Sequence, residues 1–533
     1  MCLLQCAFVT SAFACGGLFC DVNQPVVQAA ERILFAPDHQ DDAKMQMHVL
    51  LNYQGPPEEF SWLLPVPRDT EFSISSRQIF TVFDNRFAPI FSLNREGIGD
   101  CDQIARNSAP TAEFDGAAQE DSGVQVLSRE SVGPYDKVTL TGGNIEEIIQ
   151  WLTENGYQVP EGSEEVLSPY LENSVFLAIK LLPNEGSDDV EPVALTFTGT
   201  QATIPLRPTS VAATPDMGVI VHLLGSTRAI PTNFAHVEIN ELAIDWFNNG
   251  SNYADVVSQA ADESDGHAFV TDFAGAHNLG EPLFIVSDSV IEEIESARTI
   301  EELVAINEYW SIVNDPEYQA ELMDRAGLDQ DQMNCFFGGC PQEENLEVDG
   351  AAIAMGLADI NKRRENIQAL LEQHPYITRL YTTLSASEMT LDPVFDFNSD
   401  LEDVEQTRTA TLVFTCDDGE NLSLTTPSGQ QLDLQENELN PIARQDGETV
   451  RGMDNPGAAV IMQQMPSGQP EVITDNRPML EERFASQSNN QAISDDDGLF
   501  GCSQDTNRSS APLWIIALLG LITVTQRRVK ISA

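Results

Sequence analysis

Apolar and polar side chains alternate along most of the first half of the chain. Residues 31–37, 44–53 and 60–66 each keep a period of two over the length of a strand, and polar or proline-rich turns separate them. The pattern returns in the segments 124–132, 135–142, 174–182, 192–199, 202–208, 218–225, 235–245 and 267–275. These segments predict β-strands with short connections.

Helical spacing interrupts these strands and then dominates the middle of the chain. Residues 75–91 repeat apolar positions every three to four residues after a serine pair that can cap a helix. Helices are also predicted over residues 144–156, 168–173, 252–264, 288–327 and 351–372, and strands return at 376–384, 410–416 and 430–435. Strands with inserted helices, followed by a helical stretch, indicate an α+β protein with antiparallel sheets.

Changes in this pattern divide the chain. We expect a β-rich α+β domain over residues 15–285 and a helical stretch with a small β region over 286–485. A polar, disordered linker is expected over 486–510. Residues 92–122 are small and polar, which predicts a long loop inside the first domain.

Both ends carry the features of an exported protein. Residues 1–14 are apolar and end in Ala-Phe-Ala, which predicts a signal peptide cut before Cys15. Acylation of Cys15 is a weaker alternative, because Ala12 stands where lipoproteins normally have leucine. At the other end, residues 511–533 predict a transmembrane tail, with the body of the protein outside the cytoplasm.

The apolar part of the tail is short for a permanent membrane span. Residues 511–525 carry no charge, and as a helix they extend about 22 Å against a hydrocarbon core of about 30 Å. Arg527, Arg528 and Lys530 follow, and Cys502 precedes. A cysteine, a short helix and an arginine pair resemble the sorting tails of myxobacterial surface proteins. The resemblance implies processing or lipid attachment at Cys502, with the membrane and the export and sorting machinery as partners; a plain anchor is the alternative.

The net charge of −57 excludes a role in binding nucleic acid, because phosphate contacts need cations. Such a surface fits adaptation to a saline habitat, with cation binding as the alternative. The carboxylates are spread along the chain, and no segment has the spacing of a calcium-binding loop.

Six of the nine cysteines belong to the body of the protein. Two others lie in the signal segment and one in the tail. The six are Cys15, Cys20, Cys101, Cys335, Cys340 and Cys416. An even number in an exported body predicts three disulfides. Cys15 and Cys20 have the same spacing as Cys335 and Cys340, which favours one disulfide within each of these two pairs, among about fifteen possible pairings. A four-cysteine zinc site is the alternative.

A search for chemistry finds one speculative site and no catalytic motif. His236 and Glu238 share one face of a predicted strand, and with Asp245 they form a candidate cation or ligand site, although a solvated polar face explains them more simply. The sequence holds no metal-binding histidine pair, nucleophile elbow or phosphate-binding loop. We therefore assign no catalytic residue, no metal and no cofactor.

Several segments resemble an uncharacterised bacterial family, domain of unknown function 2330. They are the segments 53–67, 127–140, 151–160, 169–181, 203–225 and 374–398, together with the opening ACGGLFC. In the first of them, Trp62 and Leu64 are expected to point inward, and Pro65 and Pro67 indicate an edge strand or the exit of a strand; a groove for an extended peptide or glycan is the alternative. The resemblance implies exported, envelope-associated proteins and no known reaction.

Together these features predict an exported, surface-anchored, acidic envelope protein with a structural or binding role and an unknown ligand. The alternative is an exported hydrolase that acts on envelope polymers. The two classes differ in whether titratable side chains converge in one cleft.

Overall fold

The computed structural model describes residues 30–482, apart from 52–59, 99–128, 142, 156, 158, 160–161, 173, 183–189, 212, 281, 340–345, 416–421 and 435–455. The chain divides into two compact units, Met1–Ala485 and Ser486–Ala533. The expected signal peptide, linker and membrane tail all lie outside the described residues. Within the described part, no helix has the length and apolar character needed to cross a membrane. The transmembrane tail and the signal peptide therefore stay predictions.

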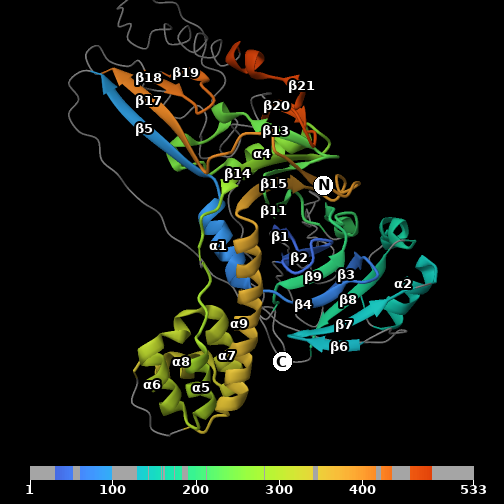
Figure 1. The fold of residues 1–533 in the computed structure, drawn as a ribbon. Helices are drawn as coiled ribbons and strands as arrows, with labels where there is room; N and C mark the ends of the chain where they lie inside the picture. Colours follow the sequence, from blue (N-terminus) through green and yellow to red (C-terminus); the bar gives the residue numbers. More distant parts are fainter. Residues whose placement is uncertain are drawn as a thin grey trace, which may run out of the picture. The chain divides into compact units, whose positions relative to one another are not determined.

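A mixed ten-stranded sheet forms the centre of the first unit (Figure 1). In spatial order its strands are β21 (Glu471–Asp475), β20 (Ala458–Gln463), β13 (Ala235–Ile239), β14 (Ala268–Ala276), β15 (Tyr376–Leu384), β11 (Met217–Gly225), β1 (Ala30–Pro37), β2 (Lys44–Leu51), β9 (Val193–Thr198) and β4 (Glu71–Ile74). Most neighbours are antiparallel, but β1 runs parallel to β11, and β13 runs parallel to β14. The expectation of antiparallel sheets is correct only in part.

Successive residues of β1 enter different cores, because side chains alternate across a strand. Ile33 and Phe35 join the core between this sheet and a second sheet. Leu34 and Ala36 join the core beneath α1 (Arg77–Phe87) and α9 (Gly350–Gln373). Burial on both faces explains the apolar runs at residues 33–36 of β1 and 217–221 of β11, where the expected period of two is not kept.

The second sheet has the order β3 (Ser61–Val66), β8 (Val175–Leu181), β7 (Tyr135–Leu140) and β6 (Arg129–Val132). One of its faces packs on the central sheet, and the other packs on α2 (Ile145–Glu154). As predicted, Trp62 and Leu64 are buried in the core and β3 is an edge strand. At such an edge Pro65 can be accommodated without the N–H that it lacks.

Two smaller sheets complete the β structure. One has the order β10 (Ala202–Thr203), β16 (Val394–Asn398) and β12 (Arg228–Pro231); the other has the order β19 (Gln431–Leu434), β18 (Leu422–Thr425), β17 (Thr407–Thr415) and β5 (Ile90–Ile98). Strand β5 corrects the prediction of a loop that begins at residue 92. It pairs in parallel with β17, more than 300 residues away in the sequence, and Phe91 packs in the core that contains α4 (Tyr253–Asp262).

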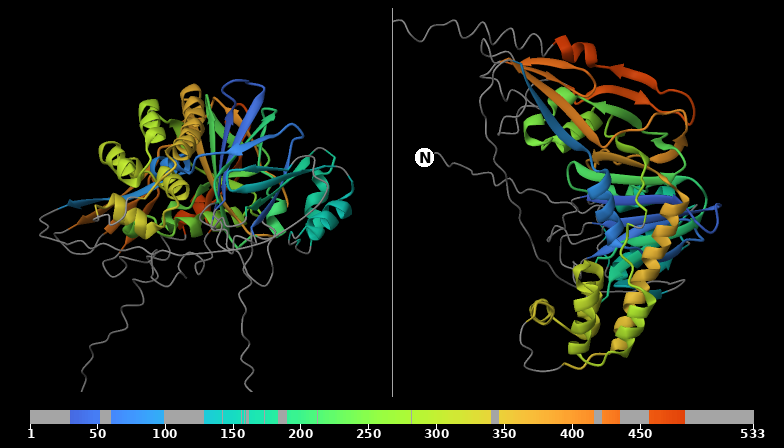
Figure 2. Two further views of the ribbon diagram at one scale, coloured as in Figure 1. Left: turned by 90° about the horizontal axis from the view of Figure 1, so that it is seen from below. Right: turned by 60° about the vertical axis from the view of Figure 1, so that its left-hand side comes forward.

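The predicted helical stretch is confirmed. It comprises α5 (Asp288–Ser296), α6 (Ile300–Trp310), α7 (Pro316–Ala326) and α8 (Gln330–Phe337), which pack with the first part of α9 around one apolar core (Figures 1 and 2). The residues on both sides of residue 285 belong to the same unit. The next strand after α9 is β15, which lies inside the central sheet between β14 and β11.

Buried charges join the helical stretch to the sheet. The side chain of Arg364 on α9 is fully buried, and its Nη2 lies 2.7 Å from Oδ1 of Asp315. Its Nε lies 2.9 Å from Oε2 of Glu317. Glu317 in turn accepts hydrogen bonds from the Ser76 hydroxyl and from the first backbone N–H group of α1. A carboxylate of α7 therefore caps the N-terminus of a helix that covers the central sheet.

Candidate functional site

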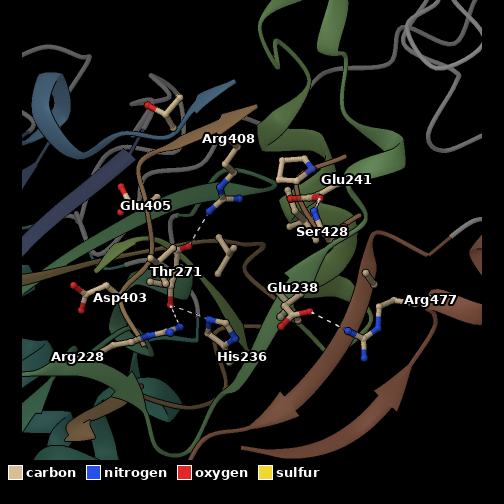
Figure 3. Close-up of a pocket in the computed structure, with 17 residues that line it drawn as sticks. Arg228, His236, Glu238, Glu241, Thr271, Asp403, Glu405, Arg408, Ser428 and Arg477 are labelled. Carbon is tan, nitrogen blue, oxygen red and sulfur yellow. Dashed lines mark hydrogen bonds and ion pairs between the residues drawn. The ribbon is translucent and has the colours of Figure 1, made fainter. Parts of the chain in front are cut away.

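A cavity of about 390 Å³ opens among β12, β13, β14 and β17 (Figure 3). Its wall also includes the turn after β18 and the segment after β21. The polar residues that line it are Arg228, His236, Glu238, Glu241, Thr271, Asp403, Glu405, Thr407, Arg408, Ser428 and Arg477. The volume lies within the range of small-molecule sites, which is roughly 300–1,000 Å³.

Thr271 on β14 is the point where three of these side chains meet. Nη2 of Arg228 donates to its Oγ1 at 3.2 Å, and Nε2 of His236 lies 2.8 Å from the same oxygen. Nη2 of Arg408 donates to its carbonyl oxygen at 2.9 Å (Figure 3). The register of β14 with β15 shifts between Thr271 and Phe273. Bulges of this kind redirect a side chain next to binding sites.

The ring of His236 is buried and neutral. Burial, followed by the positive charges of Arg228 and Arg408, lowers the pKa of His236 to about 3, so the ring carries no charge at physiological pH. Oγ1 of Thr271 accepts from Arg228 and has both a proton and a second lone pair for Nε2 of His236, so either tautomer of the ring fits this contact. Nδ1 of His236 is buried and has no hydrogen-bond partner among the described residues.

Arg228 and Arg408 have only neutral hydrogen-bond partners in the described part of the chain. Besides Thr271, Arg228 donates to the carbonyl oxygen of Glu402, and its buried Nε has no partner. No described carboxylate lies within ion-pairing distance of either guanidinium. Burial lowers the pKa of Arg228, but a guanidinium stays charged at neutral pH. Both guanidinium groups therefore lack a direct ion-pair partner among the described residues, although Tyr376, Glu238 and Asp403 partly offset the effect of burial on the pKa of Arg228.

Carboxylates occupy other positions in the same wall. Glu238 lies 3.9 Å from Nη1 of Arg477, which is held more closely by Asp475. Burial raises the pKa of Glu238 above its usual value, with opposing contributions from its charged neighbours. Oε2 of Glu241 accepts a hydrogen bond from the backbone N–H of Ser428.

The structure brings together two of the three speculative site residues. His236 and Glu238 alternate along β13 with Val237 and Ile239, which belong to an apolar core, and a cation or ligand site at this pair stays a prediction. His236 is 5% exposed, whereas the side chain of Glu238 is 52% exposed. Asp245 does not line the cavity; it caps the turn Trp246–Asn248.

Neither a metal centre nor a disulfide is found in the described residues. No group of three potential metal-ligating side chains occurs there, so His236, Glu238 and Asp245 do not form such a site. Cys335 lies in α8. Cys15, Cys20, Cys101, Cys340, Cys416 and the tail cysteine Cys502 lie outside the described part, and the predicted pairings stay predictions.

The Thr271–His236 contact has the distance of a nucleophile and its base, but its environment opposes that role. A pKa of about 3 makes His236 a weak base. Its Nδ1 lacks the orienting carboxylate that activated nucleophiles normally have. Thr271 is itself buried. The arrangement is better suited to binding than to nucleophilic catalysis.

The arginines and Thr271 are the site residues that sequence reasoning missed. Arg228 and Arg408 are about 180 positions apart in the sequence, and neither belongs to a motif. The available signal was the composition. The chain has 27 basic and 84 acidic residues, so an arginine within a predicted strand is unusual and indicates a position of interest.

Comparisons with known proteins identify a family but no activity. A family model described as "Uncharacterized protein conserved in bacteria (DUF2330)" matches residues 9–289. No curated protein matches the chain. Among solved structures, the crystal structure of baculovirus P35 matches with 12% identity, covering 41% of this chain and 78% of that chain, with a TM-score of 0.21. So low a score supports no conclusion about fold or function.

Proposed function

This chain belongs to the family of uncharacterised proteins conserved in bacteria, DUF2330, and we propose that it is an exported envelope protein that binds a small ligand through an anionic group in the cavity around Thr271. Export rests on the predicted signal segment and on the C-terminal tail with Cys502. Attachment to the membrane, through the helix or through lipid, belongs to the same proposal.

One observation carries the binding role: the unneutralised pair Arg228 and Arg408. A buried or half-buried charge without a counter-ion is costly, and proteins normally pair it. An anion in the cavity would supply the missing charge, and guanidinium groups bind carboxylates through paired hydrogen bonds. The unpartnered Nε–H group of Arg228 adds to this preference for an acceptor-rich ligand.

A hydrolase acting on envelope polymers is the second candidate, and the 2.8 Å contact between Thr271 and His236 is the observation that favours it. Turnover of a polymer by the wild-type protein that is lost in Thr271→Val, with ligand affinity retained, would support it. We favour binding because the histidine is a weak base and lacks an orienting partner.

Thermal unfolding in the presence of small anions tests the binding proposal. Acetate, succinate, phosphate and sulfate are compared at constant ionic strength, so that general salt effects cancel. We expect at least one carboxylate to raise the melting temperature of the wild-type protein and not that of the Arg228→Met/Arg408→Met variant. Arg325→Met is the matched control, since Arg325 lies on the surface of α7 in a pair with Glu321. Equal shifts in all three proteins would contradict an anion site in the cavity.

A further inference from the structure

The cavity combines cations and carboxylates, and we propose that its ligand is a small zwitterion of the amino-acid class. Its carboxylate would lie against Arg228 and Arg408, and its ammonium group would face the acidic side chains of the wall. This inference rests on the proposed function and narrows the ligand to one chemical class.

The count of charges argues against a simple anion. Three arginines and four carboxylates line the cavity: Arg228, Arg408, Arg477, Glu238, Glu241, Asp403 and Glu405. Arg477 is already paired with Asp475, which leaves two cations facing four carboxylates. A simple anion held by the two arginines would be repelled by the surrounding carboxylates, whereas a zwitterion would meet both signs of charge.

Two of the carboxylates are available to an ammonium group. Glu238 lies too far from Arg477 for a hydrogen bond, at 3.9 Å. Glu405 has neither an ion pair nor a hydrogen bond with any described residue. By contrast, Glu241 accepts from the Ser428 backbone, and Asp403 accepts from the Tyr376 hydroxyl at 2.7 Å. Figure 3 shows Glu238 beside His236 and Glu405 near Arg408.

The side chain of Glu238 is 52% exposed, so an ammonium group can reach it. The buried part of its surroundings raises the pKa of this carboxyl above its usual value. An ammonium group placed against it would favour the ionised form and lower the pKa. Ligand affinity should therefore decrease as the pH falls through the pKa of Glu238 in the unliganded protein.

The volume sets the size of the ligand. A cavity of about 390 Å³ is near the lower end of the range for small-molecule sites, roughly 300–1,000 Å³. It suits a free amino acid or a molecule of similar size rather than a polymer. The apolar lining residues Val404 and Pro427, which do not belong to a core, would contact an uncharged side chain of the ligand.

Calorimetric titration separates this inference from the proposed function. The probes are the free amino acids and, for the tightest binder, the two compounds that lack either its amino or its carboxyl group. We expect the amino acid to bind at least about tenfold more tightly than either compound, since each lacks one charge contact. If the deaminated acid binds as tightly as the amino acid, the inference is wrong and the anion site stands. If no probe binds, the proposed function itself is wrong.

Substitutions of the two available carboxylates test where the ammonium group of the ligand binds. We expect Glu238→Gln and Glu405→Gln each to weaken binding of the amino acid, and the combined variant to weaken it about tenfold or more. The affinity for the deaminated acid should stay the same or increase. Glu293→Gln, at an exposed position of α5, is the matched control and should change neither affinity. Unchanged affinity for the amino acid in the combined variant would overturn the assignment of the ammonium group.

Discussion

Two arginine clusters in this protein differ in whether carboxylates pair with the guanidinium groups. Around Arg364, the carboxylates of Asp315 and Glu317 form direct ion pairs, and the carbonyl oxygen of Phe284 accepts a further bond at 2.7 Å. The Tyr318 ring lies 4.4 Å from the guanidinium carbon. Burial tends to lower the pKa of Arg364, but the two carboxylates more than offset it and raise the pKa.

Around Thr271, the partners of the two arginines are neutral oxygens. Arg228 and Arg408 contact a hydroxyl and backbone carbonyls, and no described carboxylate neutralises them. The first cluster is complete without a ligand and joins two parts of the fold. The second leaves positive charge facing a cavity. A cluster of arginines therefore does not by itself identify a binding site. The groups that contact each guanidinium distinguish a structural cluster from a candidate binding site.

The largest effect is expected from removing Arg364. The Arg364→Met variant leaves Asp315 and Glu317 buried without their cation, and breaking such a pair costs about 3–5 kcal/mol. Denaturant unfolding measures the loss. The triple variant Asp315→Asn/Glu317→Gln/Arg364→Met should recover part of it, because no uncompensated charge remains. A loss below about 1 kcal/mol in Arg364→Met would contradict the assignment of a closed, structural ion-pair cluster.

A buried carboxyl group provides the second test of the comparison. Glu31 on β1 is 5% exposed, its Oε2 has no described partner, and burial raises its pKa from 4.5 to about 7. Between these values the native state holds a proton that the unfolded state releases. Stability contributed by the protonated form is therefore complete below pH 4.5 and is lost as pH rises through about 7.

We expect Glu31→Gln to remove this pH dependence. The difference in unfolding free energy between Glu31→Gln and the wild type should increase, in favour of the variant, by on the order of 2–3 kcal/mol between acidic and mildly alkaline pH. Denaturant unfolding at a series of pH values checks the expectation, and Glu293→Gln serves as the exposed control. Parallel curves for wild type and Glu31→Gln would show that this carboxyl titrates normally in the folded protein.

Removing the cavity arginines should affect stability less than removing Arg364. Each arginine is lost from neutral partners, so no opposite charge is stranded, and we expect Arg228→Met/Arg408→Met to unfold within about 1 kcal/mol of the wild type. A gain in stability would agree with the same reasoning. A loss as large as that of Arg364→Met would erase the distinction between the two clusters.

The smallest effect is expected at the residue between the arginines. Thr271→Val keeps the shape of the side chain but removes the oxygen that orients Arg228 and His236, so affinity for a bound carboxylate should fall about fivefold. Thr271→Ser keeps the hydroxyl and should retain most of the affinity. Titration calorimetry measures both. Equal affinities for wild type and Thr271→Val would show that the hydroxyl does not organise the site.

Local patterns predicted the elements whose signals are local. The strands around Ile33, Trp62 and Val219 and the helix capped by Asn144 follow from periodicity and capping chemistry. The parallel pairing of β5 with β17, and of β1 with β11, depends on partners far away in the sequence. No local pattern specifies such pairs, and for that reason the sequence did not predict that residues 92–98 form a strand or that the chain returns to the central sheet at β15.

The same limit explains how the site was found only in part. His236 and Glu238 stand two positions apart on one strand, so a period of two relates them. Asp245 was added to them by nearness in the sequence, but the strand ends at Ile239 and the chain turns away. Arg228, Thr271 and Arg408 come from three different strands, and the topology alone brings them together.

The most direct test of the central claim is the affinity of the tightest-binding carboxylate compound for the wild-type protein and for Arg228→Met/Arg408→Met, measured by titration calorimetry at constant ionic strength. We expect saturable one-to-one binding by the wild type, a loss of about a hundredfold or more in the double variant, and wild-type affinity in Arg325→Met. Undiminished binding by the folded double variant would contradict the claim that these two arginines form the site.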